Sequence, residues 1–400
     1  MVKITDKSVP VLTTAGEALD AARAVAAELA PGAAERDARV EPPAEALALV
    51  ARRGLLGVSI PRGLGGSGLP NADVVEILRI LAVADSSVAQ TLLPHFVLLG
   101  AVVGLADDDL RARVLPDVLR GALIGNATSE RGTKHAWDPR TTVTSDGDEV
   151  VVNGRKYYAT GALSATWVSV LARDEQGRLV TVFVPREAKG LELSDDWTSF
   201  GQRATVSGSA VLDDVRVPAA HVVPLHRAFE GPAVGGAFDQ LLHIAIDVGI
   251  ARAALEAGGA FVRTHSRPWF ESDVERVTDE QSVLVRFGQI AGQVIVTELA
   301  LERAARLLDE VLAAGPDDGN TALLSAQVAA LKSQAARVAV HTSSDVFELA
   351  GTRATDAAYG LDRHWRNART HSLHDPVRWK EYHLGNFLLN DVRPPRNPLN

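Results

Sequence analysis

The sequence predicts an α+β protein of 400 residues in which two helical segments flank a central segment of short strands. Apolar residues recur at helical spacing over roughly the first 120 residues, whereas short apolar runs separated by Asp-Gly and Asn-Gly pairs follow. Long helical patterns then return. These changes predict three units, 1–122, 123–231 and 232–400. They also exclude the regular alternation of strand and helix that a parallel sheet requires.

The N-terminal segment is expected to be helical throughout. Thr14 and Glu17 have the spacing of a capping box, and Pro31-Gly32 ends the helix that follows. Further helices are predicted over 43–53, 71–83 and 87–104. No alternating apolar pattern of the kind that indicates a strand precedes Leu123.

The central segment is expected to form a compact antiparallel sheet. Asp146-Gly147 and Asn153-Gly154 bracket the apolar run 150–152, which is the pattern of a β-hairpin. The other strand candidates are 167–171, 179–184 and 210–217. Because turn residues separate these short runs, an antiparallel arrangement is favoured over strands joined by helices.

Long helices are expected in the C-terminal segment. The helical patterns cover 236–265, 280–314, 321–349 and about 361–389. The turn sequence Gly-Pro-Asp-Asp-Gly at 315–319 separates the second pattern from the third. Alanine recurs at the inward-facing positions and permits close helix packing, so this segment is predicted to form a four-helix bundle.

Composition restricts the chemistry that the chain can perform. It has no cysteine, one methionine, and 41 Lys and Arg against 50 Asp and Glu, for a formal net charge of −9. The absence of cysteine excludes a thiolate nucleophile, Cys-ligated zinc and an iron–sulfur cluster. The acidic balance argues against general binding to nucleic acid or to an anionic membrane. Redox chemistry would therefore need an organic cofactor or a metal held by His and carboxylate.

The sequence shows no targeting signal or membrane span. Residues 1–30 lack the uninterrupted apolar core of a signal peptide. The most apolar stretch, 92–106, is interrupted by Pro94 and His95 and is short for a helix that crosses a bilayer. We therefore expect a buried core helix there and a cytoplasmic protein.

A glycine-rich segment, 63–68, matches the dinucleotide-binding pattern G-x-G-x-x-G, and Asp85 follows where a ribose-binding acid would fall. That mode of binding needs a strand before the glycines and a second parallel strand that ends at the acid. Here the residues on both sides have helical patterns. We expect a loop between helices rather than a Rossmann unit.

Histidines and basic residues gather near the C-terminus. Residues 361–380 hold five Lys or Arg and two Asp, a local charge of +3, which suits either an anionic ligand such as phosphate or a solvated face. His371 and His374 share one face if they lie on a helix. They could bind a metal, pack in the core or exchange protons, and no further ligand pattern frames a metal site. Pro376 ends the helix. The helix dipole favours protonated imidazoles at that C-terminal end.

Several motifs, taken in order, resemble those of the acyl-CoA dehydrogenase fold. They are 58–61 with 65–69, 126–130, 154–161 and 211–218. The segment 361–380 with Gly385-Asn386 is similar to the flavin-dependent monooxygenase branch of that fold, and the sulfur-acquisition oxidoreductases and dibenzothiophene monooxygenases resemble it most. Acyl-CoA dehydrogenases often carry a catalytic glutamate in this C-terminal region, whereas 370–376 contains none.

The resemblance implies which residues form the site. His371 and His374 match the His-x-x-His pair that faces the flavin in the desulfurisation enzymes, and His374 is expected to be the proton donor. His95 is expected to be either a third donor or a core histidine. Flavin-binding roles are implied for Asn126, Ser129, Thr160, Gly161, Arg263, Gly351, Arg353 and Arg369.

The resemblance also implies the reaction. FMNH2, delivered by a separate NAD(P)H:flavin reductase, would react with O2 to form a C4a-hydroperoxyflavin that oxygenates a heteroatom, most readily sulfur, of a small organic substrate. The cofactor is expected to be FMN, with FAD as the other option, and no metal, nucleic acid or membrane partner is expected. The alternatives are an N-hydroxylase of an amine or amino sugar and an FAD-dependent acyl-CoA dehydrogenase. Since members of the fold are commonly tetramers, a homotetramer is expected.

Overall fold

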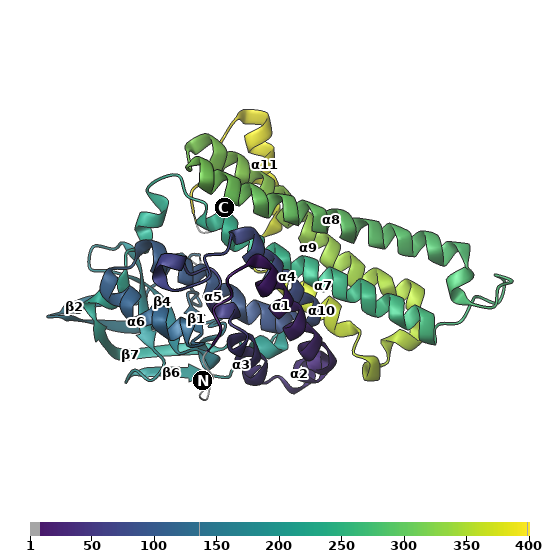
Figure 1. Ribbon diagram of the computed structural model, residues 1–400, viewed down its shortest axis with the longest axis horizontal. Coiled ribbons are helices and arrows are strands. Elements are labelled where there is room, and N and C mark those ends of the chain that lie inside the picture. Colours follow the sequence, from purple (N-terminus) through teal and green to yellow (C-terminus); the bar gives the residue numbers. More distant parts are fainter. Residues whose placement is uncertain (1–8, 136, 398) are drawn as a thin grey trace.

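The computed structural model describes residues 9–135, 137–397 and 399–400. Figure 1 shows a β-sheet at one end of the molecule and long helices that extend away from it, with the shorter N-terminal helices packed between them. The order of helices, strands and helices along the chain confirms the predicted α+β architecture.

Six helices form the N-terminal segment. They are α1 (Ala15–Leu29), α2 (Ala33–Arg39), α3 (Ala44–Arg52), α4 (Asn71–Ala84), α5 (Ser86–Leu105) and α6 (Asp108–Leu119). The capping box predicted at Thr14 and Glu17 is present. Sequence periodicity missed α2 and α6, although Asp107 caps α6 by accepting a hydrogen bond from the Leu110 amide.

The glycine-rich segment is a loop, as expected. The described residues before it, 9–62, contain no strand. A side chain at Gly66 would collide with Ile60, since its Cβ would lie 2.4 Å from that residue, so the glycine serves a close turn. Asp85 caps α5 and pairs with Arg36 at 2.7 Å. Neither feature is part of a dinucleotide site.

The sheet has eight strands. They are β1 (Ile124–Ala127), β2 (Thr142–Asp146), β3 (Glu149–Lys156), β4 (Trp167–Arg173), β5 (Leu179–Pro185), β6 (Leu191–Ser194), β7 (Ser209–Pro218) and β8 (Val222–Val223). Their order is β6-β7-β3-β2-β4-β5-β8, with β1 beside β4. The prediction of an antiparallel sheet was wrong in two places, because β1 and β2 both pair with β4 in parallel.

The two predicted turn signals of the sheet behave differently. Asp146-Gly147 does join β2 to β3 in a hairpin, with Gly147 at a φ of 66°. Asn153-Gly154 instead lies inside β3, where the pairing register with β7 shifts. A Cβ at Gly154 would lie 2.2 Å from the Thr141 hydroxyl oxygen. The glycine therefore marks a bulge rather than a turn.

Five helices form the C-terminal segment. They are α7 (Gly235–His265), α8 (Gln281–Ala314), α9 (Asp318–Ala350), α10 (Asp362–His371) and α11 (Val377–Asn390). The first three pack along one another and extend from the sheet to the far end of the molecule (Figure 1). The predicted fourth helix is two helices, broken before Pro376, so His374 lies in the break rather than on a helix face.

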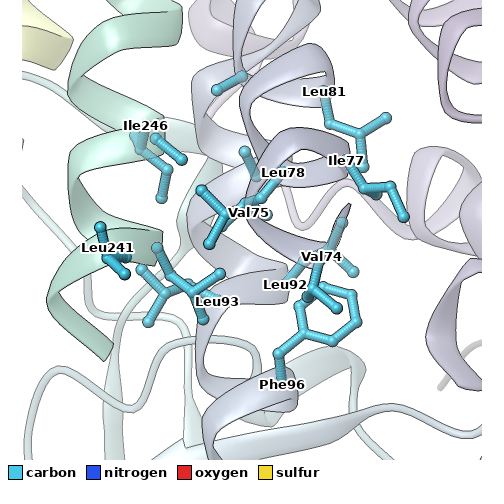
Figure 2. Packing of buried hydrophobic residues seen from close by; sticks show 14 of the residues in the cluster. Val74, Val75, Ile77, Leu78, Leu81, Leu92, Leu93, Phe96, Leu241 and Ile246 are labelled. Carbon is cyan, nitrogen blue, oxygen red and sulfur yellow. The ribbon is translucent and has the colours of Figure 1, made fainter. Parts of the chain in front are cut away.

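The two helical segments share one hydrophobic core. Figure 2 shows Val75 and Leu78 of α4 and Leu93 of α5 packed toward Leu241 and Ile246 of α7. The sheet has a second core of its own, made mainly of valine and alanine. We propose the unit boundaries 1–122, 123–231 and 232–400, with the first and third units joined through the shared core.

Two helices are long and apolar enough to cross a membrane by length and composition alone. They are α5, which is 56% buried over its apolar window with a mean hydropathy of 1.8, and α8, which is 17% buried with a mean hydropathy of 1.3. The length argument made from sequence for 92–106 was wrong, because α5 begins six residues earlier, at Ser86. The burial of α5 agrees with the expectation of a core helix in this segment.

Candidate active site

A cavity of about 1000 Å³ lies where the sheet, α5 and the first turns of α7 meet. This volume is at the upper end of the range for small-molecule sites, so a cofactor and a small substrate can be held together. Apolar side chains of α5 and α7, among them Leu93, Val97 and Phe238, form much of its wall. Polar side chains gather on two sides, one from the sheet and one from the C-terminal helices.

The polar groups on the sheet side are mainly hydroxyls and amides, together with the Glu130 carboxylate, which pairs with the buried Lys156 at 2.7 Å. Asn126, Ser129 and Thr160, three of the predicted flavin-binding residues, line the cavity together. The Thr160 hydroxyl lies 2.8 Å from the Ser207 hydroxyl, and the Thr160 carbonyl accepts a hydrogen bond from the Asn126 amide at 2.9 Å. Gly161 does not line the cavity; its φ of 78° turns the chain directly after Thr160.

The backbone on this side holds non-glycine residues in the left-handed region. Tyr158 and Gln202, which line the cavity, have φ values of 55° and 51°. Such conformations cost free energy and gather at functional sites. Among the described residues, the buried Nε2 of Gln202 has no hydrogen-bond partner, whereas its Oε1 accepts from the Ser87 hydroxyl at 3.1 Å. A ligand with an acceptor at this place would satisfy that donor.

Three histidines form the opposite side of the cavity. His371 and His374 line it as predicted, and His243 of α7 joins them. His243 Nδ1 lies 3.0 Å from His371 Nε2. The rings of His243 and His374 lie 3.8 Å apart between centroids, tilted by 32°. The pair predicted from sequence is therefore a cluster of three imidazoles.

A buried ion pair lies behind the cluster. His371 Nδ1 lies 2.6 Å from Asp247 Oδ1, and Lys332 donates to Asp247 Oδ2 at 2.9 Å. Both Asp247 and Lys332 are fully buried. Burial alone would raise the pKa of Asp247, but Lys332 and His371 outweigh it and hold that pKa below its usual value. Asp247 is thus a buried carboxylate with two partners.

Burial sets the charge of the inner histidines. It lowers the pKa of His371 by more than the attraction of Asp247 raises it. It also lowers the pKa of His243 well below the usual value, and the charges of His374 and Lys332 act in the same direction. The expectation that the helix dipole favours protonated imidazoles was therefore wrong for His371, because desolvation at this depth dominates.

His374 has different surroundings. Its side chain is 40% exposed, and its Nδ1 lies 3.7 Å from Asp375 Oδ1. Asp375 pairs with Lys380 at 3.1 Å, and Lys380 also donates to the backbone carbonyl of Leu399, which fixes the end of the chain at the cavity. Burial would raise the pKa of Asp375, yet His374 and the two nearby lysines lower it. A proton on His374 Nδ1 therefore faces a carboxylate.

His95 is a core residue rather than a third donor. It is fully buried and does not line the cavity. Its Nε2 lies 3.0 Å from the Leu56 carbonyl, and its Nδ1 accepts from the Ile124 amide at 3.1 Å. Desolvation lowers its pKa to about 4. With both ring nitrogens bonded to backbone, His95 joins the N-terminal helices to the start of the sheet.

The predicted phosphate-binding residues do not line this cavity. Arg263 lies in the last turn of α7, and at 1.5 Å per residue it is about 30 Å along the helix from His243. Gly351 and Arg353 follow α9 at the same far end of the bundle, and both are exposed. Arg369 is exposed on α10, and other basic residues of 361–380 are paired with acids. Arg263 and Arg353 therefore lie too far along the bundle to reach a ligand in the cavity of their own chain.

Sequence reasoning missed the polar residues of α7. Asp239, His243 and Asp247 are spaced four residues apart in a helix whose buried residues are mostly apolar. This spacing puts all three on one face, which is the signal that could have found them. Burial, reinforced by Asp375, raises the pKa of Asp239 to about 6. Lys332 gave a similar signal, a lone lysine among alanines of α9.

No cluster of His, Cys, Asp and Glu that could hold a metal ion occurs among residues 9–135, 137–397 and 399–400. The three histidines instead contact one another and the carboxylates of α7 and of the chain after α10. The chemistry available to this side of the cavity is hydrogen bonding and proton exchange.

Most of the chain matches one family. Models described as acyl-CoA dehydrogenase N-terminal, middle and C-terminal domains match residues 17–122, 126–215 and 241–379. The dibenzothiophene monooxygenase of Rhodococcus erythropolis is 31% identical over 359 residues, 85% of each chain. A probable FMNH2-dependent monooxygenase of Pseudomonas putida, SfnC, is 32% identical over 96% of this chain and 98% of its own.

The chain belongs to the flavin-dependent monooxygenase branch of the acyl-CoA dehydrogenase family. The crystal structure of FMN-bound TdsC from Paenibacillus sp. A11-2 matches it with a TM-score of 0.91 and 31% identity, over 96% of this chain and 100% of that one. The resemblance inferred from the sequence motifs is thereby confirmed. The N-terminal, middle and C-terminal domain matches fall on the helical, β and helical units found here.

Proposed function

We propose that the chain is an FMNH2-dependent monooxygenase that transfers one oxygen atom of O2 to the sulfur of a small organic substrate. The observation that carries the proposal is the cavity itself, whose wall holds hydroxyls and amides from the sheet segment and three imidazoles from the helical segment. The names of the related dibenzothiophene monooxygenase and FMNH2-dependent monooxygenase support sulfur and reduced FMN. The alternatives from sequence are an N-hydroxylase and an acyl-CoA dehydrogenase.

The cavity fits a flavin. Its volume accommodates a ring system beside a substrate, and the unpartnered Nε2 of Gln202 offers a donor to a ligand acceptor. Asn126, Ser129 and Thr160 would hold the ring by hydrogen bonds from the sheet side. When bound, reduced FMN supplies the electrons with which O2 is activated.

The residues around the flavin would then perform three tasks. Leu93, Val97 and Phe238 exclude water, which would otherwise divert the reaction. His374 exchanges a proton through Nε2, because its Nδ1 faces the Asp375 carboxylate. His371, which is fully buried and bonded through both nitrogens, orients its neighbours rather than supplying the proton.

A product screen tests the proposal. The protein is combined with FMN, O2, NADH, a generic flavin reductase, and a panel of sulfides, sulfoxides, sulfones and amines, and products are followed by mass spectrometry. We expect one added oxygen on sulfur. Oxygenated amines alone would favour the N-hydroxylase, and the absence of any oxygenated product would refute monooxygenation.

We further propose that a separate reductase supplies FMNH2, as the name of SfnC suggests, and that the reaction takes place in the cytoplasm. The expected result is no product from NADH and FMN until a reductase is added. Product formation without it would overturn the two-component scheme. Cell fractionation with an antibody to the chain checks the location.

We also propose a homotetramer. One side of α8 exposes apolar side chains, among them Leu284, Ile295, Val296 and Leu299. In an oligomer these would be buried, and Arg263, Gly351 and Arg353 would be able to approach the flavin of a neighbouring copy, which they cannot reach in their own chain. Light scattering after gel filtration should give the mass of four chains, and Val296→Glu should lower it. A monomer, or sedimentation of the wild type with lipid vesicles through α8, would contradict this proposal.

A further inference from the structure

Four buried side chains connect α9 to the cavity. Lys332 contacts Asp247, Asp247 contacts His371 Nδ1, and His371 Nε2 contacts His243 Nδ1, at 2.9, 2.6 and 3.0 Å. Every one of these contacts needs one proton between its two atoms. The arrangement therefore restricts where the ring protons of both histidines can be.

The carboxylate of Asp247 determines which nitrogen of His371 carries the first proton. Asp247 is ionised, because Lys332 and His371 hold its pKa below the usual value. A carboxylate only accepts hydrogen bonds, so His371 carries a proton on Nδ1. His371 is neutral, since burial lowers its pKa. Its Nε2 therefore keeps a lone pair and accepts a hydrogen bond from His243.

The second proton follows from the first. His243 must donate from Nδ1 to His371, and it too is neutral because burial lowers its pKa well below the usual value. Its only ring proton is thus on Nδ1, and its Nε2 has a free lone pair at the wall of the cavity. We infer that His243 is a hydrogen-bond acceptor for the ligand in the cavity, and that Asp247 and Lys332 position it through His371.

The groups that face His243 act on this assignment in different directions. On α7, Asp239 Oδ1 lies 4.0 Å from His243 Nε2; an ionised Asp239 favours a proton on Nε2 and opposes the assignment, whereas a protonated Asp239 can donate to Nε2 and supports it. Beyond α10, His374 stacks on His243 at 3.8 Å, with Asp375 and Lys380 behind it. Two imidazoles so close do not both hold a positive charge.

The consequence concerns what the cavity binds, and it rests on the proposed function. The histidine wall presents a donor at His374 and an acceptor at His243. A group bound against both must offer an acceptor to His374 and an N–H or O–H to His243. The reduced flavin ring carries an N–H group that the oxidised ring lacks. If that N–H lies against the acceptor nitrogen of His243, His243 would favour binding of the reduced cofactor over the oxidised one.

Nitrogen NMR of the flavin-free protein tests the tautomers. With ¹⁵N-labelled histidine at pH 7, we expect His243 and His371 both to be neutral and to carry the proton on Nδ1. A proton on Nε2 of His243, or an imidazolium at either residue, overturns the inference. Since the experiment uses neither flavin nor substrate, its failure is distinguishable from failure of the proposed function, which the product screen measures.

A variant tests the positioning role. Asp247→Asn keeps the shape of the side chain but removes the obligate acceptor, so His243 should populate both tautomers. With reductase and reduced FMN, product formation should fall about 10- to 100-fold, the effect of losing one charged hydrogen bond. If the single tautomer of His243 persists in this variant, Asp247 does not position it.

The control is Asp37→Asn. It breaks a less deeply buried pair, Asp37 with Arg366 at 2.6 Å, neither of which lines the cavity. This variant should keep the His243 tautomer and the wild-type rate of product formation. If the control variant also loses the single tautomer of His243, the change follows from general destabilisation of the fold. The specific positioning role of Asp247 would then be overturned. If Asp247→Asn fails to fold, the wild-type spectrum still decides the tautomer.

Discussion

The two polar sides of the cavity are built in different ways. On the sheet side, hydroxyls and amides such as those of Asn126 and Thr160 lie beside the Glu130 carboxylate, whose buried partner Lys156 is 26 residues away in sequence. On the helical side, ionisable groups 85 to 128 residues apart form one buried network. The sheet side can lose a hydroxyl with little consequence, whereas the helical side depends on every member. Differences among variants should follow this contrast.

The largest effect is expected from breaking the buried ion pair. Lys332→Met leaves the charge of Asp247 without its main partner and should lower the free energy of unfolding by about 3–5 kcal/mol. Urea unfolding followed by circular dichroism measures it. Asp247→Leu combined with Lys332→Met should recover much of this loss, because no lone charge is then buried.

The matched control is an exposed pair. Arg23 and Asp20 lie 2.8 Å apart on the surface of α1. Arg23→Met should change the stability by less than about 1 kcal/mol, since solvent screens that pair. Equal losses at the two pairs would show that the helical-side network has no special energetic role.

The next effect concerns the exposed member of the histidine wall. His374→Ala removes the proposed proton donor, and product formed per flavin consumed should fall about 100-fold or more. Product and hydrogen peroxide are measured in the same reaction with reductase present. His341→Ala, at an exposed histidine of α9, is the control and should leave the ratio unchanged. Unchanged coupling in His374→Ala would refute the assigned role.

Asp239 should give a pH-dependent effect of intermediate size. Its pKa is raised to about 6, above that of an unfolded chain, so its contribution to stability is present at acid pH and lost as pH rises from about 4 to 6. The free energy of unfolding of Asp239→Asn, relative to that of the wild type, should therefore rise by about 2 kcal/mol between pH 4 and pH 8. Thermal unfolding across that pH range measures the difference. A constant difference would mean that burial does not perturb this carboxyl.

The smallest effect is expected on the sheet side. Thr160→Ala removes one hydroxyl from the hydrogen-bonded set with Ser207, and the affinity for FMN should fall about 3- to 10-fold. Quenching of flavin fluorescence measures the dissociation constant. Thr264→Ala, at an exposed threonine of α7, serves as the control. A 100-fold loss in Thr160→Ala would erase the contrast between the two sides.

Much of the fold could be predicted because its signals are local. Three correctly predicted features each depend on residues within a few positions of one another. They are the capping box at Thr14, the turn at Gly147 and the end of a helix before Pro376. Reliance on local sequence also explains why a turn was wrongly predicted at Asn153-Gly154. Its sequence is compatible with both a hairpin and a bulge, and only the contact of Gly154 with Thr141 decides between them.

The candidate site could be predicted only in part. Asn126, Ser129, Thr160 and the two C-terminal histidines were found through motifs, which record residue types that act together. The sequence left His95 open between a donor and a core histidine, because its partners, the Leu56 carbonyl and the Ile124 amide, are not visible from sequence spacing.

The sequence by itself determined the order of the three units, the lack of thiol chemistry and the presence of imidazoles near the C-terminus. The tertiary structure decided which imidazoles reach the cavity and which protons they hold. The reason is physical: desolvation and ion pairing act through space, and Asp247, Lys332 and His371 meet only when α7, α9 and α10 pack together.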